Sequence, residues 1–203
     1  FNERPGTVSN QYLHDLYRFF KLSVRRHEFR DIFKEKLDLH HIPALNNVLY
    51  NEYILFPIAD FYLKKERWNE AIEVYEEMET IGALKGRGAE YYQKLGYALQ
   101  KNKKYAEAID AYLKADTLKP DNIWNNRHLA ICYRLNRNYQ AALSYYKKVE
   151  EATPESTNVI FHIGSCLAEL GQYEEAANYF FKLDFIESNC IKAWRGIGWC
   201  SFI

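Results

Sequence analysis

Four cysteines are the residues of this sequence best suited to redox or metal chemistry: Cys132, Cys166, Cys190 and Cys200. Cys132, Cys166 and Cys200 follow one another with a constant step of 34 in the numbering. If that step places them on equivalent packed helices, about 8–10 Å apart, they are too distant for a disulfide, whose Cα atoms lie within about 7 Å. The sequence contains no Cys-x-x-Cys pair. We therefore expect reduced, structural cysteines, which favours a reducing compartment and a cytoplasmic location.

The histidines and carboxylates form no recognisable catalytic or metal-binding motif. His40 and His41 are adjacent beside Pro43, and chain neighbours rarely bind one metal ion together. His128 and His162 are separated by the same step as the cysteines, but the further ligands of a zinc site are not evident. There is no His-Glu-x-x-His, glycine-rich phosphate loop or Gly-x-Ser-x-Gly. We predict no catalytic, cofactor-binding or metal-binding residues, and hence a protein that is not an enzyme.

The composition argues against two further classes of partner. The chain of 203 residues has 27 Lys plus Arg and 27 Asp plus Glu, so it lacks the basic excess typical of nucleic-acid binding. No stretch approaches the roughly 18 apolar residues that a membrane-spanning helix needs, so no membrane insertion is expected. With 48% hydrophobic residues, 9 Gly and 5 Pro, the chain is expected to form long helices joined by short links.

The elements that position these residues repeat along the chain with the same constant step. A shift of 34 in the numbering superimposes Tyr105, Tyr139 and Tyr173; Ala108, Ala142 and Ala176; Tyr112, Tyr146 and Phe180; and Leu95, Leu129, Ile163 and Ile197. Each member of the last set is followed by a small residue: Gly96, Ala130, Gly164 and Gly198. An earlier unit, displaced by three residues, carries Trp68, Ala71 and Tyr75 in matching columns. So many coincident columns indicate a true internal repeat.

Each repeat has the apolar spacing of two helices. The first half carries apolar or small residues at i, i+3, i+4 and i+7: Tyr92, Leu95, Gly96 and Leu99. The second half continues this spacing from Tyr105 to Ala115. After it, Pro120 disfavours further helix and Asp121 or Asn122 can cap the next one. Each unit is therefore predicted to be a helical hairpin in which small residues let helices approach and aromatic residues fill the facing space.

This pattern resembles the tetratricopeptide repeat (TPR). The resemblance covers residues 52–203 and implies an all-α fold, a right-handed superhelical solenoid of antiparallel helix hairpins. The expected units are 52–85, 89–122, 123–156, 157–190 and a half unit 191–203. Pro57 departs from the pattern and is expected to shorten or kink the opening helix. The pentatricopeptide family, which reads RNA with a unit one residue longer, is the alternative, but the constant step of 34 and the neutral charge disfavour it.

Residues 1–51 fit the repeat less well. Apolar stripes over 12–20 and 24–37 predict two helices, which form either a degenerate repeat or a separate helical cap. The segment 41–43 is expected to separate them from the first clear unit. The chain begins with Phe1 and stops inside an apolar segment, so we interpret it as a fragment of a larger protein.

The side chains left over after packing lie on one face of each first helix. Stacked hairpins should place these faces along the concave side of the superhelix. Twelve residues form this predicted groove, named the groove set: Gln93, Lys94, Tyr97, Lys101, Trp124, Arg127, His128, Ile131, Arg134, Phe161, His162 and Ser165. The half unit adds Lys192, Arg195, Gly196, Trp199, Phe202 and Ile203 to the same face.

The composition of this face is typical of a protein-binding surface. With Glu90 and Glu169, which lie on the same helix faces, it carries six basic and two acidic side chains, a local excess of four positive charges in a neutral chain. Aromatic residues mixed with Arg are enriched at binding hot spots. The alternative is that Trp124 and Phe161 pack against neighbouring units and that the basic excess is chance.

One subset of TPR domains binds the C-terminal carboxylates of chaperones through Lys, two Asn, and a further Lys and Arg. The resemblance places Gln93, Tyr97, His128, Asn158 and His162 at these positions. Because the asparagine pair is missing, that partner class is disfavoured.

The sequence thus predicts a scaffold or adaptor module that binds an extended peptide or a helix of another protein, with Arg127 and Arg134 pairing with acidic groups of the ligand. An architectural or self-association segment is the alternative, as is a regulatory domain attached to an enzyme or transcription factor. The apolar residues of 191–203 have no following hairpin, so a homo-oligomeric or end-to-end contact is expected there.

Overall fold

The computed structural model describes residues 52–82 and 86–202 together with the single residues 15, 18, 22 and 40. The chain divides into a unit of residues 1–42 and a unit of residues 43–203, and every helix named here belongs to the second. Apart from the single residues 15, 18 and 22, the segment 12–37 in which two helices are predicted lies outside the described residues, as do the break at 41–43 and Ile203.

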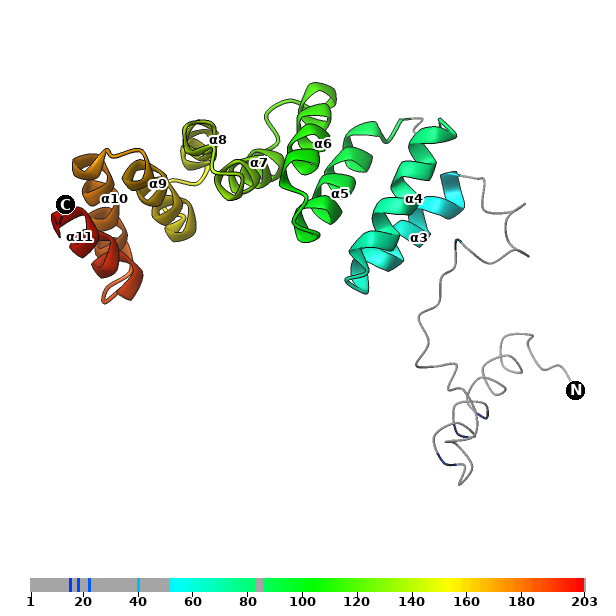
Figure 1. Ribbon diagram of the computed structural model, residues 1–203, viewed down its shortest axis with the longest axis horizontal. Coiled ribbons are helices and arrows are strands. Elements are labelled where there is room, and N and C mark those ends of the chain that lie inside the picture. Colours follow the sequence, from blue (N-terminus) through cyan, green and yellow to red (C-terminus); the bar gives the residue numbers. More distant parts are fainter. Residues whose placement is uncertain are drawn as a thin grey trace, which may run out of the picture. The chain divides into compact units, whose positions relative to one another are not determined.

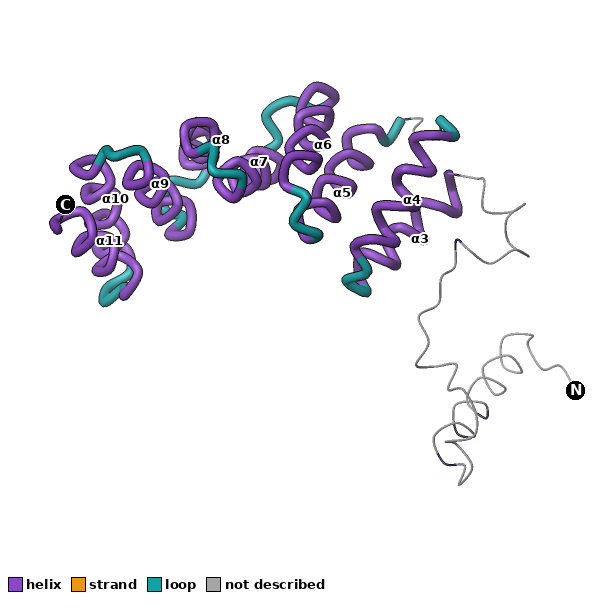
Figure 2. The backbone as a smooth tube through the Cα atoms, in the orientation of Figure 1, coloured by secondary structure: helices purple, strands orange, loops and turns teal. Residues whose placement is uncertain are grey.

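Over 52–82 and 86–202 the chain is helical with short connections and no strands (Figures 1 and 2). The helices are α3 (Glu52–Lys64), α4 (Trp68–Thr80), α5 (Gly88–Lys101), α6 (Tyr105–Leu118), α7 (Ile123–Leu135), α8 (Tyr139–Ala152), α9 (Thr157–Glu169), α10 (Tyr173–Ile186) and α11 (Ile191–Phe202). Each helix packs against the next, and the pairs α3–α4, α5–α6, α7–α8 and α9–α10 form hairpins (Figure 1). The α11 helix packs against α9 and α10. The all-α solenoid of helix hairpins predicted from the sequence is confirmed.

The four hairpin turns share one backbone geometry. Each contains one residue with positive φ: Glu66 (57°), Lys103 (64°), Arg137 (62°) and Gly171 (77°). In the second of these turns the amide of Lys104 donates to the carbonyl of Leu99 at 2.9 Å, and the amide of Lys103 donates to that of Gln100 at 3.1 Å. These are the two hydrogen bonds of a Schellman motif, and the other three turns repeat them. Only one turn uses glycine, so the others hold a strained left-handed residue that these bonds stabilise.

The boundary between α6 and α7 follows the predicted cap. The α6 helix ends at Leu118, two residues before Pro120, and the side chain of Asn122 accepts a hydrogen bond from the amide of Asn125 at 3.1 Å. This bond satisfies one of the free amides at the start of α7. The expectation that Pro57 shortens the opening helix is not met, because α3 continues to Lys64 with Pro57 inside it, exposed to solvent.

Small residues in the first helices face aromatic rings of the second helices, as predicted. A Cβ atom added to Gly96 would lie 2.8 Å from the ring of Tyr112, and one added to Gly164 would lie 2.9 Å from that of Phe180. Both aromatic side chains are buried. The helices of a hairpin therefore approach closely because no side chain separates them at this position.

A second repeated contact joins successive hairpins. The Tyr91 hydroxyl donates to the carbonyl of Tyr75 at 2.6 Å, and at the equivalent position of the next unit the Asn125 amide group donates to the carbonyl of Tyr112 at 3.0 Å. Tyr91 and Asn125 are both fully buried. The sequence analysis chose Tyr92 as the packing residue of this helix, whereas Tyr92 is half-buried and Tyr91 makes the interhelical bond.

The cysteines are packing residues. All four are free thiols, and Cys132 and Cys166 are fully buried. Burial raises the pKa of Cys132 to about 12 and that of Cys166 to about 11. Such thiols are protonated at neutral pH and therefore poor nucleophiles.

Candidate functional site

The groove set lies on the three helices α5, α7 and α9, with unequal exposure. Trp124 is 42% exposed, and Lys101 and Arg127 are also exposed. The other nine members are half-buried: Gln93, Lys94, Tyr97, His128, Ile131, Arg134, Phe161, His162 and Ser165. The set is therefore a partly covered surface and not a row of freely solvated side chains.

An aromatic cluster joins α4, α5 and α7. The Tyr97 ring lies 6.0 Å from Trp68, 6.3 Å from Trp124 and 5.7 Å from His128, measured between centroids. The Trp124 and His128 rings are 4.0 Å apart, and the Lys101 ammonium lies 5.3 Å from the Tyr97 centroid. The structure thus brings together four groove-set residues that come from two different repeats. Trp124 packs against neighbouring rings and is also partly exposed. It therefore has features of both alternatives, a packing residue and a surface residue.

His128 is a packing residue as well as a groove residue. Its ring stacks on Tyr112 with centroids 5.8 Å apart, and its Nδ1 lies 2.8 Å from the side-chain oxygen of Gln100. The Tyr112 hydroxyl donates to the same oxygen at 3.0 Å. Burial, followed by the charges of Arg127 and Lys101, lowers the pKa of His128 to about 4. The imidazole is therefore neutral at pH 7.

His162 repeats this arrangement one unit later. Its ring stacks on Tyr146 with centroids 5.5 Å apart. Burial lowers its pKa to about 4, with further contributions from Arg134, Lys192 and Arg127 in that order. Three cations from α7 and α11 therefore act on one half-buried ring. No group of three or more His, Cys, Asp and Glu side chains that could hold a metal ion occurs among the residues the structure describes.

Lys94 differs from the other basic residues of the groove set because carboxylates neutralise it. Its ammonium lies 2.8 Å from carboxylate oxygens of Asp60 and Glu90, and 4.5 Å from the centroid of Phe56. Burial alone would lower the pKa of Lys94, but its hydrogen bonds to Asp60 and Glu90 outweigh burial and raise it. Lys94 is thus occupied within the fold.

The remaining cations of the face have no such partner. Within 52–82 and 86–202, no ion pair involves Lys101, Arg127, Arg134, Lys192 or Arg195. The acidic member left on this face is Glu169, which is exposed. The positive excess predicted from the sequence is therefore retained after the internal ion pairs are taken into account.

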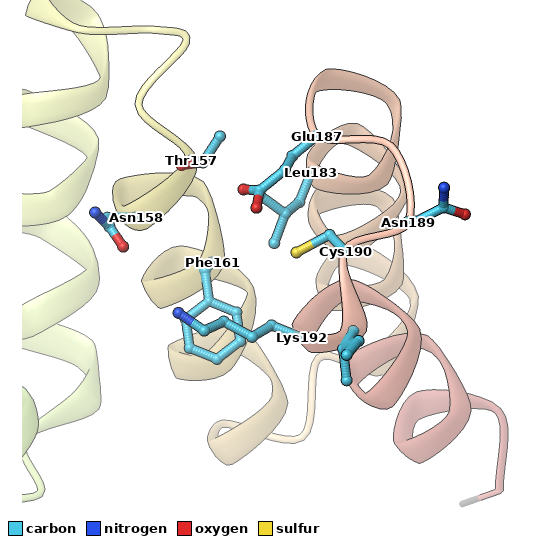
Figure 3. A pocket seen from close by; sticks show the side chains of 9 residues that line it. Thr157, Asn158, Phe161, Leu183, Glu187, Asn189, Cys190 and Lys192 are labelled. Carbon is cyan, nitrogen blue, oxygen red and sulfur yellow. The ribbon is translucent and has the colours of Figure 1, made fainter.

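Two cavities flank the ring of Phe161 at the C-terminal end of this face. One, of about 290 Å³, lies between the start of α9 and the connection from α10 to α11; in Figure 3 the Lys192 side chain extends beside the Phe161 ring. The distance from the Lys192 ammonium to the ring centroid is 5.7 Å. The other, of about 450 Å³, lies between α9 and α11. Apolar side chains and one glycine line much of the larger cavity: Phe161, Ala168, Phe180, Gly196 and Trp199.

We name the larger cavity the Phe180 cavity. The sequence analysis did not identify one of the residues that line it, Phe180. The sequence analysis assigned four of its lining residues to the first-helix face: Lys192, Arg195, Gly196 and Trp199. Phe180 comes from the second helix α10 and was treated only as a core residue. Phe180 could have been recognised as a lining residue because it lies opposite the small residues Gly164 and Gly196 of the first helices.

None of the described helices is long and apolar enough to cross a bilayer.

Comparisons with known proteins agree with this architecture. Tetratricopeptide repeat models match residues 55–82 and 89–122, and a model described as anaphase-promoting complex, cyclosome, subunit 3 matches residues 117–183. No curated protein sequence matches the chain.

Solved structures share the fold at low sequence identity. MamA from Desulfovibrio magneticus RS-1 has a TM-score of 0.67 at 18% identity, over 74% of this chain and 84% of MamA. A tetratricopeptide repeat protein from Parabacteroides merdae ATCC 43184 has a TM-score of 0.64 at 20% identity, over 74% of this chain and 59% of that one. The first TPR of Spaghetti (RPAP3), bound to the HSP90 peptide SRMEEVD, has a TM-score of 0.51 at 23% identity, over 57% and 92%. Helices α3 to α11 of this chain therefore form a tetratricopeptide-repeat solenoid.

Proposed function

We propose that this solenoid is a protein-interaction scaffold whose first-helix face binds an acidic peptide segment of another protein. The observation that carries the proposal is a set of five cations on the face that also carries exposed aromatic rings. None of the five, Lys101, Arg127, Arg134, Lys192 and Arg195, forms an ion pair within residues 52–82 and 86–202. A cation that has no carboxylate within its own fold can pair with one on a ligand without first breaking an internal ion pair.

The aromatic cluster supports the same function. Trp124 and Tyr97 are held by ring contacts, so little side-chain freedom is lost when a ligand packs on their exposed parts. Rigid aromatic side chains beside Arg are common anchors in protein interfaces. The similar TPR domain of Spaghetti is solved with a peptide that contains three acidic residues, which supports a peptide as the class of ligand.

The mode of binding proposed here differs from a clamp built on an asparagine pair. Of the five positions compared in the sequence analysis, His128 and His162 stack on tyrosines of the preceding hairpin. Arg127 is exposed on α7 and is free to contact a ligand. Electrostatic attraction of this kind weakens as the salt concentration rises.

A charge reversal tests the proposal. We expect Arg127→Glu to weaken binding of a fluorescein-labelled peptide Glu-Glu-Phe-Glu-Glu roughly three- to tenfold, measured by fluorescence anisotropy, because attraction is replaced by repulsion. The matched control is Lys147→Glu, an equal charge change at an exposed site of the second helix α8. Equal affinities of both variants and the wild type, with unchanged circular dichroism, would contradict the proposal. Equal binding of Lys-Lys-Phe-Lys-Lys would contradict it too.

Self-association is a second candidate function, favoured by exposed apolar side chains on α11. Trp194 and Trp199 are each 61% exposed, and Phe202 is 88% exposed. Isolated surface apolar residues are common, whereas a group on one short helix is typical of a contact surface. Light scattering over a range of concentrations tests it: a constant monomer mass would contradict self-association.

A further inference from the structure

One position of the repeat is a histidine in α7 and α9 but a glycine in α11. In the last three first helices this position is occupied by His128, His162 and Gly196. The two histidine rings stack on the aromatic residue of the preceding second helix, Tyr112 and Tyr146 respectively. An imidazole therefore covers the tyrosine ring where α7 packs on α6 and where α9 packs on α8.

At the third interface the residue in this position is Gly196, which has no side chain. A Cβ atom added to Gly196 would lie 2.6 Å from the Phe180 ring, so the backbone of α11 itself covers the ring. The Phe180 cavity, of about 450 Å³, opens beside this contact between α9 and α11. Its size lies within the range of about 300–1,000 Å³ that is usual for small-ligand sites.

The chemistry of the lining indicates what the cavity can accept. Phe161, Trp199 and Phe180 provide aromatic walls, which favour an apolar side chain over a polar one. Lys192 and Arg195 lie at the same cavity and make no ion pair among the described residues. The combination complements an apolar side chain that has carboxylates next to it.

We propose that the Phe180 cavity is the anchor site of the groove and accepts one bulky apolar side chain, such as Phe, that is flanked by acidic residues in the bound peptide. The inference depends on the proposed function, because it names the residue by which the acidic peptide is held. Charge along the groove supplies attraction, whereas this cavity supplies selectivity for the apolar residue.

The experiment compares two peptides, Glu-Glu-Phe-Glu-Glu and Glu-Glu-Ala-Glu-Glu, by isothermal titration calorimetry. We expect the wild type to bind the Phe peptide at least about tenfold more tightly, because the ring is buried in the complex. Ala168→Phe, which fills the cavity from α9, should bring the two affinities together by weakening the binding of the Phe peptide. Ala106→Phe, at an exposed alanine of α6, is the matched control and should keep the preference.

Each other outcome overturns the inference. Equal wild-type affinities for the two peptides would remove the anchor while leaving acidic-peptide binding intact, and no binding of either peptide would remove both proposals. A wild-type dimer that Ala168→Phe dissociates in sedimentation velocity would assign the cavity to a second copy of the chain. Ser165→Leu fills the cavity from another position and serves as the test if Ala168→Phe does not fold, as judged by circular dichroism.

Discussion

The interface between α5–α6 and α7 and the interface between α9–α10 and α11 are built from the same repeat positions. In the first, the buried Tyr112 lies between Gly96 and the ring of His128. In the second, Phe180 lies against Gly164 and Gly196, and a cavity of about 450 Å³ opens beside it. The first interface is filled by the histidine ring, whereas in the second the backbone of Gly196 lies directly against the Phe180 ring and the cavity opens beside that contact.

The glycines of the repeat also differ in what lies next to them in the two regions. Gly96 and Gly164 are buried against rings of their own hairpins, whereas an added Cβ atom at Gly198 would have no neighbour within 4 Å. The α11 helix therefore has the sequence of a first helix but no second helix packed on that face among the described residues. Among the described residues, α11 therefore packs mainly against α9 and α10.

The largest expected effect is the removal of an aromatic ring from the filled interface. We expect Tyr112→Ala to lower the free energy of unfolding by about 3–5 kcal/mol, because a fully buried ring leaves a cavity. Trp199→Ala, at a side chain 61% exposed, should change it by less than about 1 kcal/mol. Urea unfolding followed by circular dichroism measures both. Equal losses would mean that the C-terminal end is as tightly packed as the middle.

A drop in pH should act on the filled interfaces through their histidines. Burial, the largest cause, lowers the pKa of His128 and His162 to about 4, whereas an unfolded histidine has a pKa of about 6.5. Protons therefore bind more tightly to the unfolded chain. The stability is complete above pH 6.5 and is lost as the pH falls toward 4, by at most about 2 kcal/mol per histidine at pH 5.

Urea unfolding at pH 7 and pH 5 checks this prediction. We expect the double variant His128→Gln, His162→Gln to show a smaller loss between the two pH values than the wild type, because glutamine does not titrate. Carboxylates contribute equally to both proteins, so the difference reports the histidines. An identical loss in the two proteins would show that the imidazoles are not the groups responsible.

One substitution at two equivalent glycines is expected to have effects of opposite sign. Gly96→Ala places a Cβ atom 2.8 Å from the Tyr112 ring and should destabilise by about 1–3 kcal/mol. Gly198→Ala meets nothing within 4 Å and should stabilise by up to about 1 kcal/mol through helix propensity. Thermal unfolding of both variants measures the opposite signs. A destabilising Gly198→Ala would indicate that this face of α11 is covered in solution.

Much of the fold could be predicted from the sequence because each repeat determines its own hairpin. The columns of Leu95, Gly96 and Tyr112 specify two apolar helix faces, and the turn between them closes through local backbone bonds. Tyr91 was not identified, because its neighbour Tyr92 fits the apolar spacing equally well and only the bond to the Tyr75 carbonyl distinguishes them.

The candidate site could be predicted only in part. Its charge excess follows from composition, since Lys101, Arg127 and Arg134 lie at first-helix positions outside the apolar repeat columns. The neutralisation of Lys94 by Asp60 depends on the distance between two hairpins, which a sequence pattern does not contain.

The sequence by itself determined the helices, their pairing and the sign of the charge on the first-helix face, because these depend on the repeat period and on residue type. The tertiary structure alone decided that His128 and His162 fill their interfaces and that a cavity opens beside the contact of Gly196 with Phe180. The physical reason is that filling depends on how closely two backbones approach, and that approach is the combined result of every side chain packed between them.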